Sequence, residues 1–88
     1  MARLRTIEHK RALVMRLKRV EGQLRGLQRL IEDEADCEAI AQQLSAARRA
    51  LDKTHHSLLG CLIETRLTDH GVARAEVKQA VDLVARFG

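Results

Sequence analysis

Residues 37–65 read CEAIAQQLSAARRALDKTHHSLLGCLIET, and this stretch decides the fold. Its small and apolar positions recur in alternating steps of three and four residues, the repeat of a helix that packs lengthwise against another helix. These positions are Ile40, Leu44, Ala47, Leu51, Thr54, Leu58, Cys61 and Thr65. Cys37 opens the stretch and Cys61 lies near its other end. The pattern therefore predicts one long helix whose packing surface carries both thiols.

The composition of the whole chain indicates an all-α protein. The 88 residues contain no proline, tryptophan or tyrosine, and Phe87 is the only aromatic side chain. Alanine, leucine, arginine, glutamate and glutamine, which favour helices, are abundant. No linker, repeat or low-complexity tract divides the sequence. We expect residues 1–88 to form a single small domain that buries much of its apolar surface against copies of itself.

Two further helices flank the central one. Thr6 is a candidate N-cap for a helix over residues 7–32, in which apolar residues again alternate in steps of four and three. They are Leu13, Leu17, Val20, Leu24, Leu27 and Ile31. A short third helix is predicted from Ala73, Val77, Ala80, Val84 and Phe87, after a turn at residues 68–71. The expected protomer has two long helices and one short one.

Positive charge is concentrated in the first third of the chain. Residues 1–30 hold nine lysines and arginines against two acids, Glu8 and Glu21. At 100° per residue, one group of these cations falls on a single stripe away from the apolar positions: Arg11, Lys18, Arg25 and Arg29. Such a stripe favours a polyanionic partner, most plausibly nucleic acid. The alternative is a helix face that is merely solvated.

The spacing of the cysteines predicts an oligomer if the two thiols act together. Twenty-four residues separate them, roughly 36 Å along a straight helix at 1.5 Å per residue. In an antiparallel pair of these helices centred near Arg49, Cys37 would oppose Cys61 of the second copy, and the thiol pair would occur twice. A cysteine in the first turn of a helix is also well placed to act as a thiolate toward a metal or an electrophile.

Other chemistry is sparse. No phosphate loop, HExxH, CxxC or nucleophile with a spaced base is present, so we do not expect an enzyme. His9, His55 and His56 are weak candidates for additional ligands, since neither His55 nor His56 is at a co-facial helical spacing from Cys61. No apolar run has membrane-spanning length and no signal peptide opens the chain. We expect a cytoplasmic protein with reduced thiols and no membrane partner.

The run RLKRVEGQLRGLQRLIEDEADCEAIAQQLSAARRAL, residues 16–51, resembles the CsoR/RcnR/FrmR family of copper-sensing, nickel/cobalt-sensing and formaldehyde-responsive repressors. The resemblance covers residues 9–67 well and the third helix loosely. It rests on a basic first helix, a cysteine that opens the second, and these residues: Arg16, Arg19, Gly22, Gln23, Gln42, Gln43 and Arg48. It implies antiparallel dimers that pair into tetramers, bind operator DNA, and release it when an effector occupies a site between subunits.

The effector is left open by the sequence. In metal-sensing members of the family, a histidine and a cysteine or histidine follow the first cysteine by 25 and 29 residues, where this chain has Leu62 and Arg66. Three hypotheses remain: a transition metal (copper, nickel, cobalt or zinc) bound at Cys37 and Cys61, an oxidant such as persulfide that bridges the thiols, or a small electrophile that reacts with Cys37. In the last two cases there is no cofactor, only thiol modification.

We therefore predict an effector-responsive transcriptional repressor. The expected DNA contacts, mainly to phosphates, are Arg11, Arg16, Lys18, Arg19, Arg25, Arg29 and Arg48. The alternative from another class is a helical metal-binding or protein-interaction module without specific DNA binding.

Overall fold

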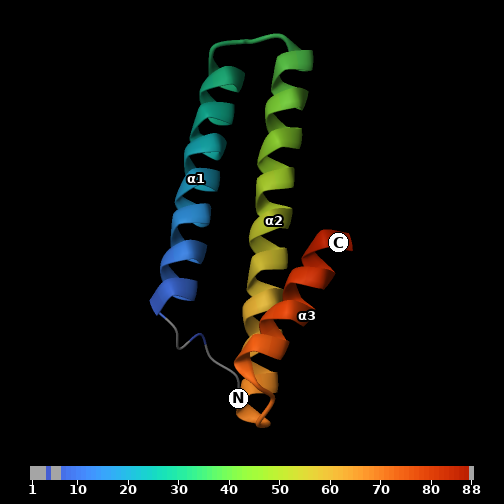
Figure 1. The fold of residues 1–88 in the computed structure, drawn as a ribbon. Helices are drawn as coiled ribbons and strands as arrows, with labels where there is room; N and C mark the ends of the chain where they lie inside the picture. The colour runs from blue at the N-terminus through green and yellow to red at the C-terminus, as the bar shows by residue number, and fades with distance from the viewer. Residues whose placement is uncertain (1–3, 5–6, 88) are drawn as a thin grey trace.

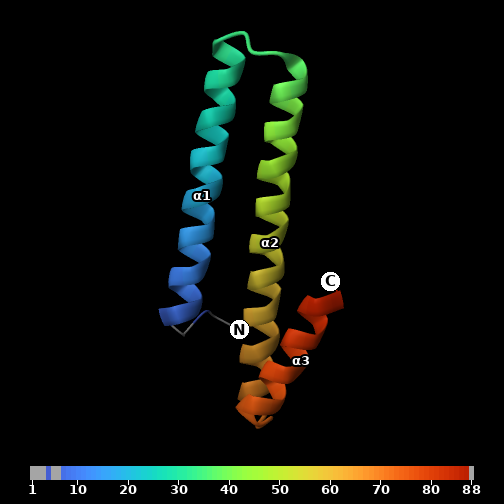
Figure 2. The ribbon, with the colours of Figure 1, turned by 45° about the horizontal axis from the view of Figure 1, so that its top comes forward.

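The computed structural model describes residue 4 and residues 7–87, and this part of the chain is built from three helices. Helix α1 spans Ile7–Glu32, α2 spans Cys37–Asp69 and α3 spans Arg74–Phe87. In both ribbon views α1 and α2 run side by side in opposite directions, and α3 folds back against the far half of α2 (Figure 1, Figure 2). The predicted all-α protomer with two long helices and one short one is confirmed. Thr6 lies outside the described residues.

The hairpin core consists of two matching lines of side chains. Leu13, Val20 and Leu27 are buried on α1, and Ala47, Thr54 and Cys61 are buried on α2. Each line has a spacing of seven residues, so it follows one side of its helix along its length. The hydroxyl of Thr54 donates a hydrogen bond to the Ala50 carbonyl oxygen at 2.9 Å, which satisfies this polar group inside the core.

Part of each predicted apolar stripe remains exposed: three of the six positions on α1 and three of the eight on α2. We call the six residues concerned the apolar face: Leu17, Leu24, Ile31, Leu44, Leu51 and Leu58. Each is 41–57% exposed. Five of the six follow a buried residue by four positions, and Leu44 follows the half-buried Ile40 by the same interval. This spacing rotates each side chain by about 40° to one side of the core line. Because the helices are antiparallel, this rotation brings all six side chains to the same side of the hairpin. Residues 37–65 thus carry two packing surfaces, only one of which is covered within the protomer.

The residues at the two ends of α2 are typical of helix termini. Asp36 occupies the N-cap position of α2, although its side chain makes no capping hydrogen bond. At the other end α2 continues to Asp69, and the chain reverses at Gly71, whose φ of 84° favours glycine.

The face that α3 turns toward α2 differs from the prediction. Val77 is 1% exposed and is the most completely buried side chain, whereas Ala80, Val84 and Phe87 are exposed. Val81, one turn after Val77, approaches α2 at Gly60, where an added Cβ would lie 3.2 Å from Val81 Cγ1. The close approach of the two helices at Gly60 therefore selects Val77 and Val81 as the contact, in place of the predicted line through Ala80 and Val84.

Candidate nucleic-acid interface and cysteine sites

A basic groove lies between α1 and α2. It encloses about 260 Å³ and is lined by Arg16, Arg19, Gln23, Ala46, Arg49, Ala50 and Lys53. The α1 members are spaced by three and four residues, as are the α2 members, so each set shares one side of its helix. The small side chains of Ala46 and Ala50 form part of the wall. Four cations and no acid therefore surround a concave surface, which suits an anion such as a phosphate.

The groove and the apolar face lie on opposite sides of the hairpin. Arg16 follows the buried Leu13 by three residues and is rotated by about 60° in one sense, while Leu17 is rotated by about 40° in the other. The same relation holds on α2 for Ala50 and Leu51, counted from Ala47. A second molecule on the apolar face would therefore leave the groove open.

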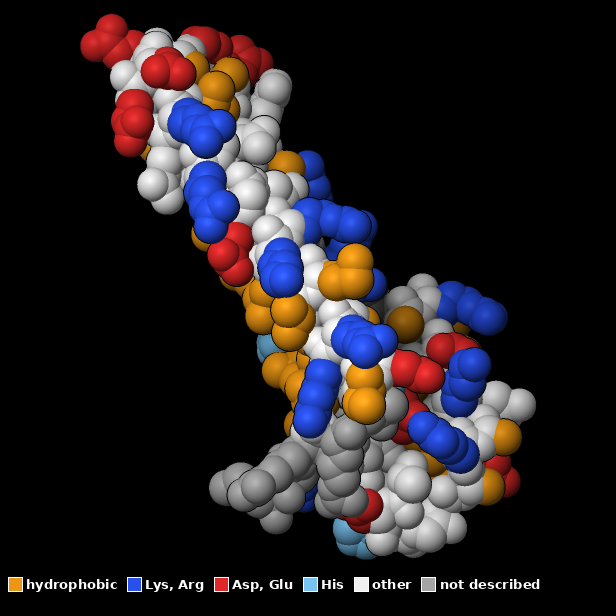
Figure 3. Space-filling model, turned by 90° about the vertical axis from the view of Figure 1, so that its left-hand side faces the viewer, with side chains coloured by type: hydrophobic (Ala, Val, Ile, Leu, Met, Phe, Trp, Pro, Cys, Tyr) orange, Lys and Arg blue, Asp and Glu red, His pale blue; other side chains and the backbone are white. Residues whose placement is uncertain are grey.

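The predicted stripe of Arg11, Lys18, Arg25 and Arg29 is exposed but faces away from α2. A line of lysine and arginine side chains follows the molecule from this side, with acidic side chains gathered at one end (Figure 3). Arg25 pairs with Glu21 at 3.6 Å, with both side chains largely exposed. The structure thus separates the predicted DNA contacts into two surfaces, with Arg16 and Arg19 in the groove and the stripe outside it.

The α2 side of the groove was missed in the sequence. Arg48 was predicted to contact DNA, but it is exposed on the flank of α2 nearer the apolar face and does not line the groove. Arg49 and Lys53 line it instead. Their four-residue spacing, together with Ala46 and Ala50, was the signal available in the sequence.

The two cysteines have different environments. Cys37 is the first residue of α2 and is exposed, whereas Cys61 is 7% exposed in the hairpin core. They lie toward opposite ends of the same helix, so one protomer does not bring them together. Desolvation by burial, with a smaller contribution from the Glu64 carboxylate, raises the pKa of Cys61 above its ordinary value of 9.0. Cys37 is therefore the accessible thiol, and Cys61 is held in the protonated form.

A second pocket, of about 630 Å³, contains Cys61 and extends between α2, α3 and the start of α1. His9 and His56 also line it, so the fold brings two of the three candidate histidines to the same pocket as this thiol. The five-residue spacing of His56 and Cys61 does not place them on the same face of α2, but the pocket is wide enough for both residues to line it. His55 is exposed and does not line the pocket. Among the described residues, no group of three histidine, cysteine or acidic side chains is arranged to hold a metal ion.

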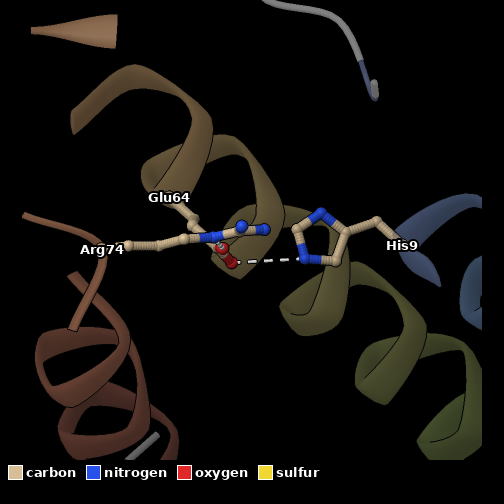
Figure 4. Close-up of polar contacts among 3 residues, drawn as sticks. All are labelled: His9, Glu64 and Arg74. Carbon is tan, nitrogen blue, oxygen red and sulfur yellow. Dashed lines mark ion pairs between the residues drawn. The ribbon is translucent and has the colours of Figure 1, made fainter. Parts of the chain in front are cut away.

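Glu64 links all three helices beside this pocket. Its Oε2 lies 3.2 Å from Nε2 of His9, and its Oε1 lies 3.8 Å from Nε of Arg74 (Figure 4). The Glu64 side chain is only 23% exposed, so these contacts are partly shielded from solvent. His9 is thus already engaged by a carboxylate within the protomer, and its other ring nitrogen, Nδ1, is buried without a hydrogen-bond partner.

No helix in the described part of the chain is both long and apolar enough to cross a membrane.

Comparison with known proteins finds similar sequences over most of the chain. The family described as metal-sensitive transcriptional repressor matches residues 9–86. The copper-sensing transcriptional repressors CsoR of Mycobacterium bovis and Mycobacterium tuberculosis are each 34% identical over 80 residues, which cover 85% of this chain. The chain spans 66% of the length of these relatives, slightly less than two thirds. The match includes all of α2 and nearly all of α1 and α3, and we conclude that the chain belongs to the family of metal-sensitive transcriptional repressors, which are regulators and not enzymes.

Proposed function

We propose that this protein is an effector-responsive transcriptional repressor that binds operator DNA through the basic groove. One observation carries the proposal: Arg16, Arg19, Arg49 and Lys53 converge on one concave surface that no acidic side chain lines. Phosphate contacts from arginine and lysine supply most of the affinity of such an interface. Family membership argues against the alternative of a metal-binding or protein-interaction module without a regulatory role.

The apolar face supports a homodimer. Leu44, Leu51 and Leu58 are spaced by seven residues, so two antiparallel copies of α2 centred on Leu51 would pair Leu44 with Leu58 of the second copy. Leu17, Leu24 and Ile31 would extend the same contact, forming a four-helix core. The two-fold axis at Leu51 lies two residues from Arg49, where the spacing of the two cysteines places it. Pairing of two such dimers into a tetramer is part of the proposal on the basis of the family resemblance.

The dimer would complete an effector site at Cys37. With Leu51 at the two-fold axis, Cys37 lies opposite Thr65 of the second copy, about one helical turn from that copy's Cys61. Thiolate sulfur suits copper, zinc, nickel or cobalt, and the names of the relatives favour a metal as effector. We therefore propose that occupancy of the site containing Cys37 and Cys61 releases DNA.

Modification of Cys37 is the second candidate mechanism. It is favoured by the exposure of Cys37 together with the burial of Cys61, and by Leu62 and Arg66, neither of which is a ligand for a soft metal. A small electrophile would need only the accessible thiol, whereas a persulfide that bridges the thiols would start at Cys37 and also need Cys61. Both mechanisms act on the same residue and differ in whether a metal is bound.

Charge reversal tests the DNA-binding surface. Lys53→Glu in the groove should weaken binding to an operator fragment by roughly tenfold or more, because it replaces a phosphate contact with a repulsion. Lys18→Glu, the same substitution on the outward stripe, compares the two surfaces predicted to contact DNA and should cost much less if the groove, and not the stripe, binds the phosphates. Fluorescence anisotropy at several salt concentrations measures both, with circular dichroism to verify helicity. Equal losses in the two variants, or binding that does not weaken with salt, would contradict the proposal.

A further inference from the structure

The second pocket has the size and lining of a small-molecule site. Its volume of about 630 Å³ falls in the range of about 300–1,000 Å³ typical of ligand pockets. One wall is apolar and comes from both helices that flank it, with contributions from Leu59, Ile63, Val81, Val84 and Ala85. The absence of a side chain at Gly60 keeps this wall close to α3, where Val81 Cγ1 lies 3.2 Å from the position of an added Cβ.

The charges of the pocket are segregated. Arg16 and Lys53 lie at the end that adjoins the basic groove. The lining contains a single carboxylate, Glu64, and its two oxygens already face His9 and Arg74 at 3.2 and 3.8 Å (Figure 4). An anionic group entering near Arg16 and Lys53 therefore meets cations whose charge Glu64 does not neutralise. The remaining surface suits an uncharged hydrocarbon body.

The Cys61 thiol contributes to the apolar part of this pocket. The residue is 7% exposed, and its burial favours the neutral form. A protonated thiol packs as a small hydrophobic group and is a weak nucleophile. The pocket is therefore suited to reversible binding and not to covalent capture of a ligand.

The pocket and the DNA-binding groove share two residues. Arg16 and Lys53 line both. A ligand whose anionic group occupies these cations would remove them from contact with phosphate. Binding in the pocket and binding of DNA are thus coupled by competition for the same positive charges.

We propose that the pocket between α2 and α3 binds an amphiphilic carboxylate, with its hydrocarbon chain along Val81, Val84 and Ala85 and its carboxylate at Arg16 and Lys53, and that this ligand weakens DNA binding. The regulatory part rests on the proposed function, because it requires DNA to occupy the basic groove. The site is separate from Cys37 and provides a second input to the same repressor.

The test uses decanoate below its micelle concentration as the probe, with acetate and decanol as controls for charge without chain and chain without charge. Isothermal titration calorimetry of the DNA-free protein should show saturable decanoate binding, with decanol at least tenfold weaker and acetate undetectable. Val84→Glu places a carboxylate in the pocket wall and should weaken decanoate binding at least tenfold. Leu83→Glu, the neighbouring substitution outside the pocket lining, should leave it unchanged. Val84 and Leu83 are 62% and 53% exposed, so neither change disturbs the core.

Anisotropy of the DNA complex measures the regulatory part. Decanoate should raise the apparent Kd for DNA with the unmodified protein and with Leu83→Glu, and not with Val84→Glu. If decanoate binds saturably but the protein binds no DNA, the ligand site stands and the proposed function fails. The ligand would then have no regulatory role. Three results would overturn the ligand site: no saturable decanoate binding, equal binding by Val84→Glu, or a change of oligomeric state in Val84→Glu alone, which would identify this surface as an interface between copies.

Discussion

The two thiols, chemically identical in the sequence, differ because of the positions they occupy on α2. Cys37 begins the helix and is exposed, whereas Cys61 is packed in the hairpin core within one turn of Glu64. Burial and the negative charge of Glu64 both disfavour a thiolate at Cys61. An effector that requires a free thiolate therefore meets Cys37 first.

Alkylation rates test this difference. At neutral pH, iodoacetamide should react faster with Cys61→Ala, which retains only Cys37, than with Cys37→Ala, which retains only Cys61. Adding Glu64→Gln to Cys37→Ala should move the pH midpoint of alkylation downward, because it removes a charge that raises the pKa of Cys61. Adding Glu38→Gln, at the distant start of α2, should not move it. Equal rates for the two thiols would contradict the assignment of Cys37 as the accessible one.

The raised pKa of Cys61 also has a consequence for stability. Because the folded protein holds this thiol protonated, its contribution to stability is complete below the ordinary thiol pKa of 9.0 and is lost as pH rises through the higher pKa of the folded state.

At the same scale, the sequence predicted only part of the groove. Of the cations that line it, Arg16 and Arg19 were predicted as DNA contacts and Arg49 and Lys53 were not; Arg48, also predicted as a DNA contact, lies outside the groove. A helical wheel of α2 alone does not reveal which flank adjoins the cations of α1. That relation depends on the rotation of α2 about its axis, which the burial of Ala47, Thr54 and Cys61 determines.

At the scale of elements, the number and extent of the helices were predictable because caps, turns and apolar spacing agree along the chain. Helix α1 matches its predicted range, and α2 ends at Asp69, two residues into the predicted turn at residues 68–71. The contact face of α3 was not predictable. Ala80 and Val84 have the helical spacing of a buried line, but the short distance between helices at Gly60 selects Val77 and Val81.

The burial of Val77 predicts how α3 is held. Val77→Ala should lower the free energy of unfolding by about 1–3 kcal/mol, through lost apolar contact and the cavity left behind. Leu83→Ala, on the exposed side of the same helix, should change it by less than about 0.5 kcal/mol. Urea denaturation followed by circular dichroism measures both at one protein concentration. Similar losses in the two variants would mean that α3 packs through a different face.

At the scale of the whole molecule, one protomer leaves six large apolar side chains of the hairpin exposed on one side. Three of the six apolar positions predicted for α1 and three of the eight predicted for α2 are therefore available for a partner. In the proposed dimer, burial of this face would enlarge the core of a chain of 88 residues that has a single aromatic side chain.

A charge at the centre of the apolar face should dissociate the dimer. Leu51→Glu places two carboxylates near the proposed two-fold axis, and sedimentation velocity should show a shift to monomers together with reduced thermal stability. Leu83→Glu, which adds the same charge on α3 away from this face, should retain the oligomeric state of the unmodified protein. An unchanged sedimentation coefficient for Leu51→Glu would show that copies associate through another surface.

The proposal as a whole requires that an effector acting at Cys37 release DNA. The most direct measurement is a titration of the DNA complex, followed by anisotropy, with Cu(I), Ni(II), Co(II), Zn(II), persulfide and formaldehyde in separate experiments. With the unmodified protein, one of these effectors should release the DNA. Cys37→Ala should bind the same DNA with unchanged affinity and should not respond, while Cys61→Ala should show a weakened response if the effector is a metal. Release of DNA from Cys37→Ala at the same effector concentration, or no release from the unmodified protein by any of the six, would contradict the account.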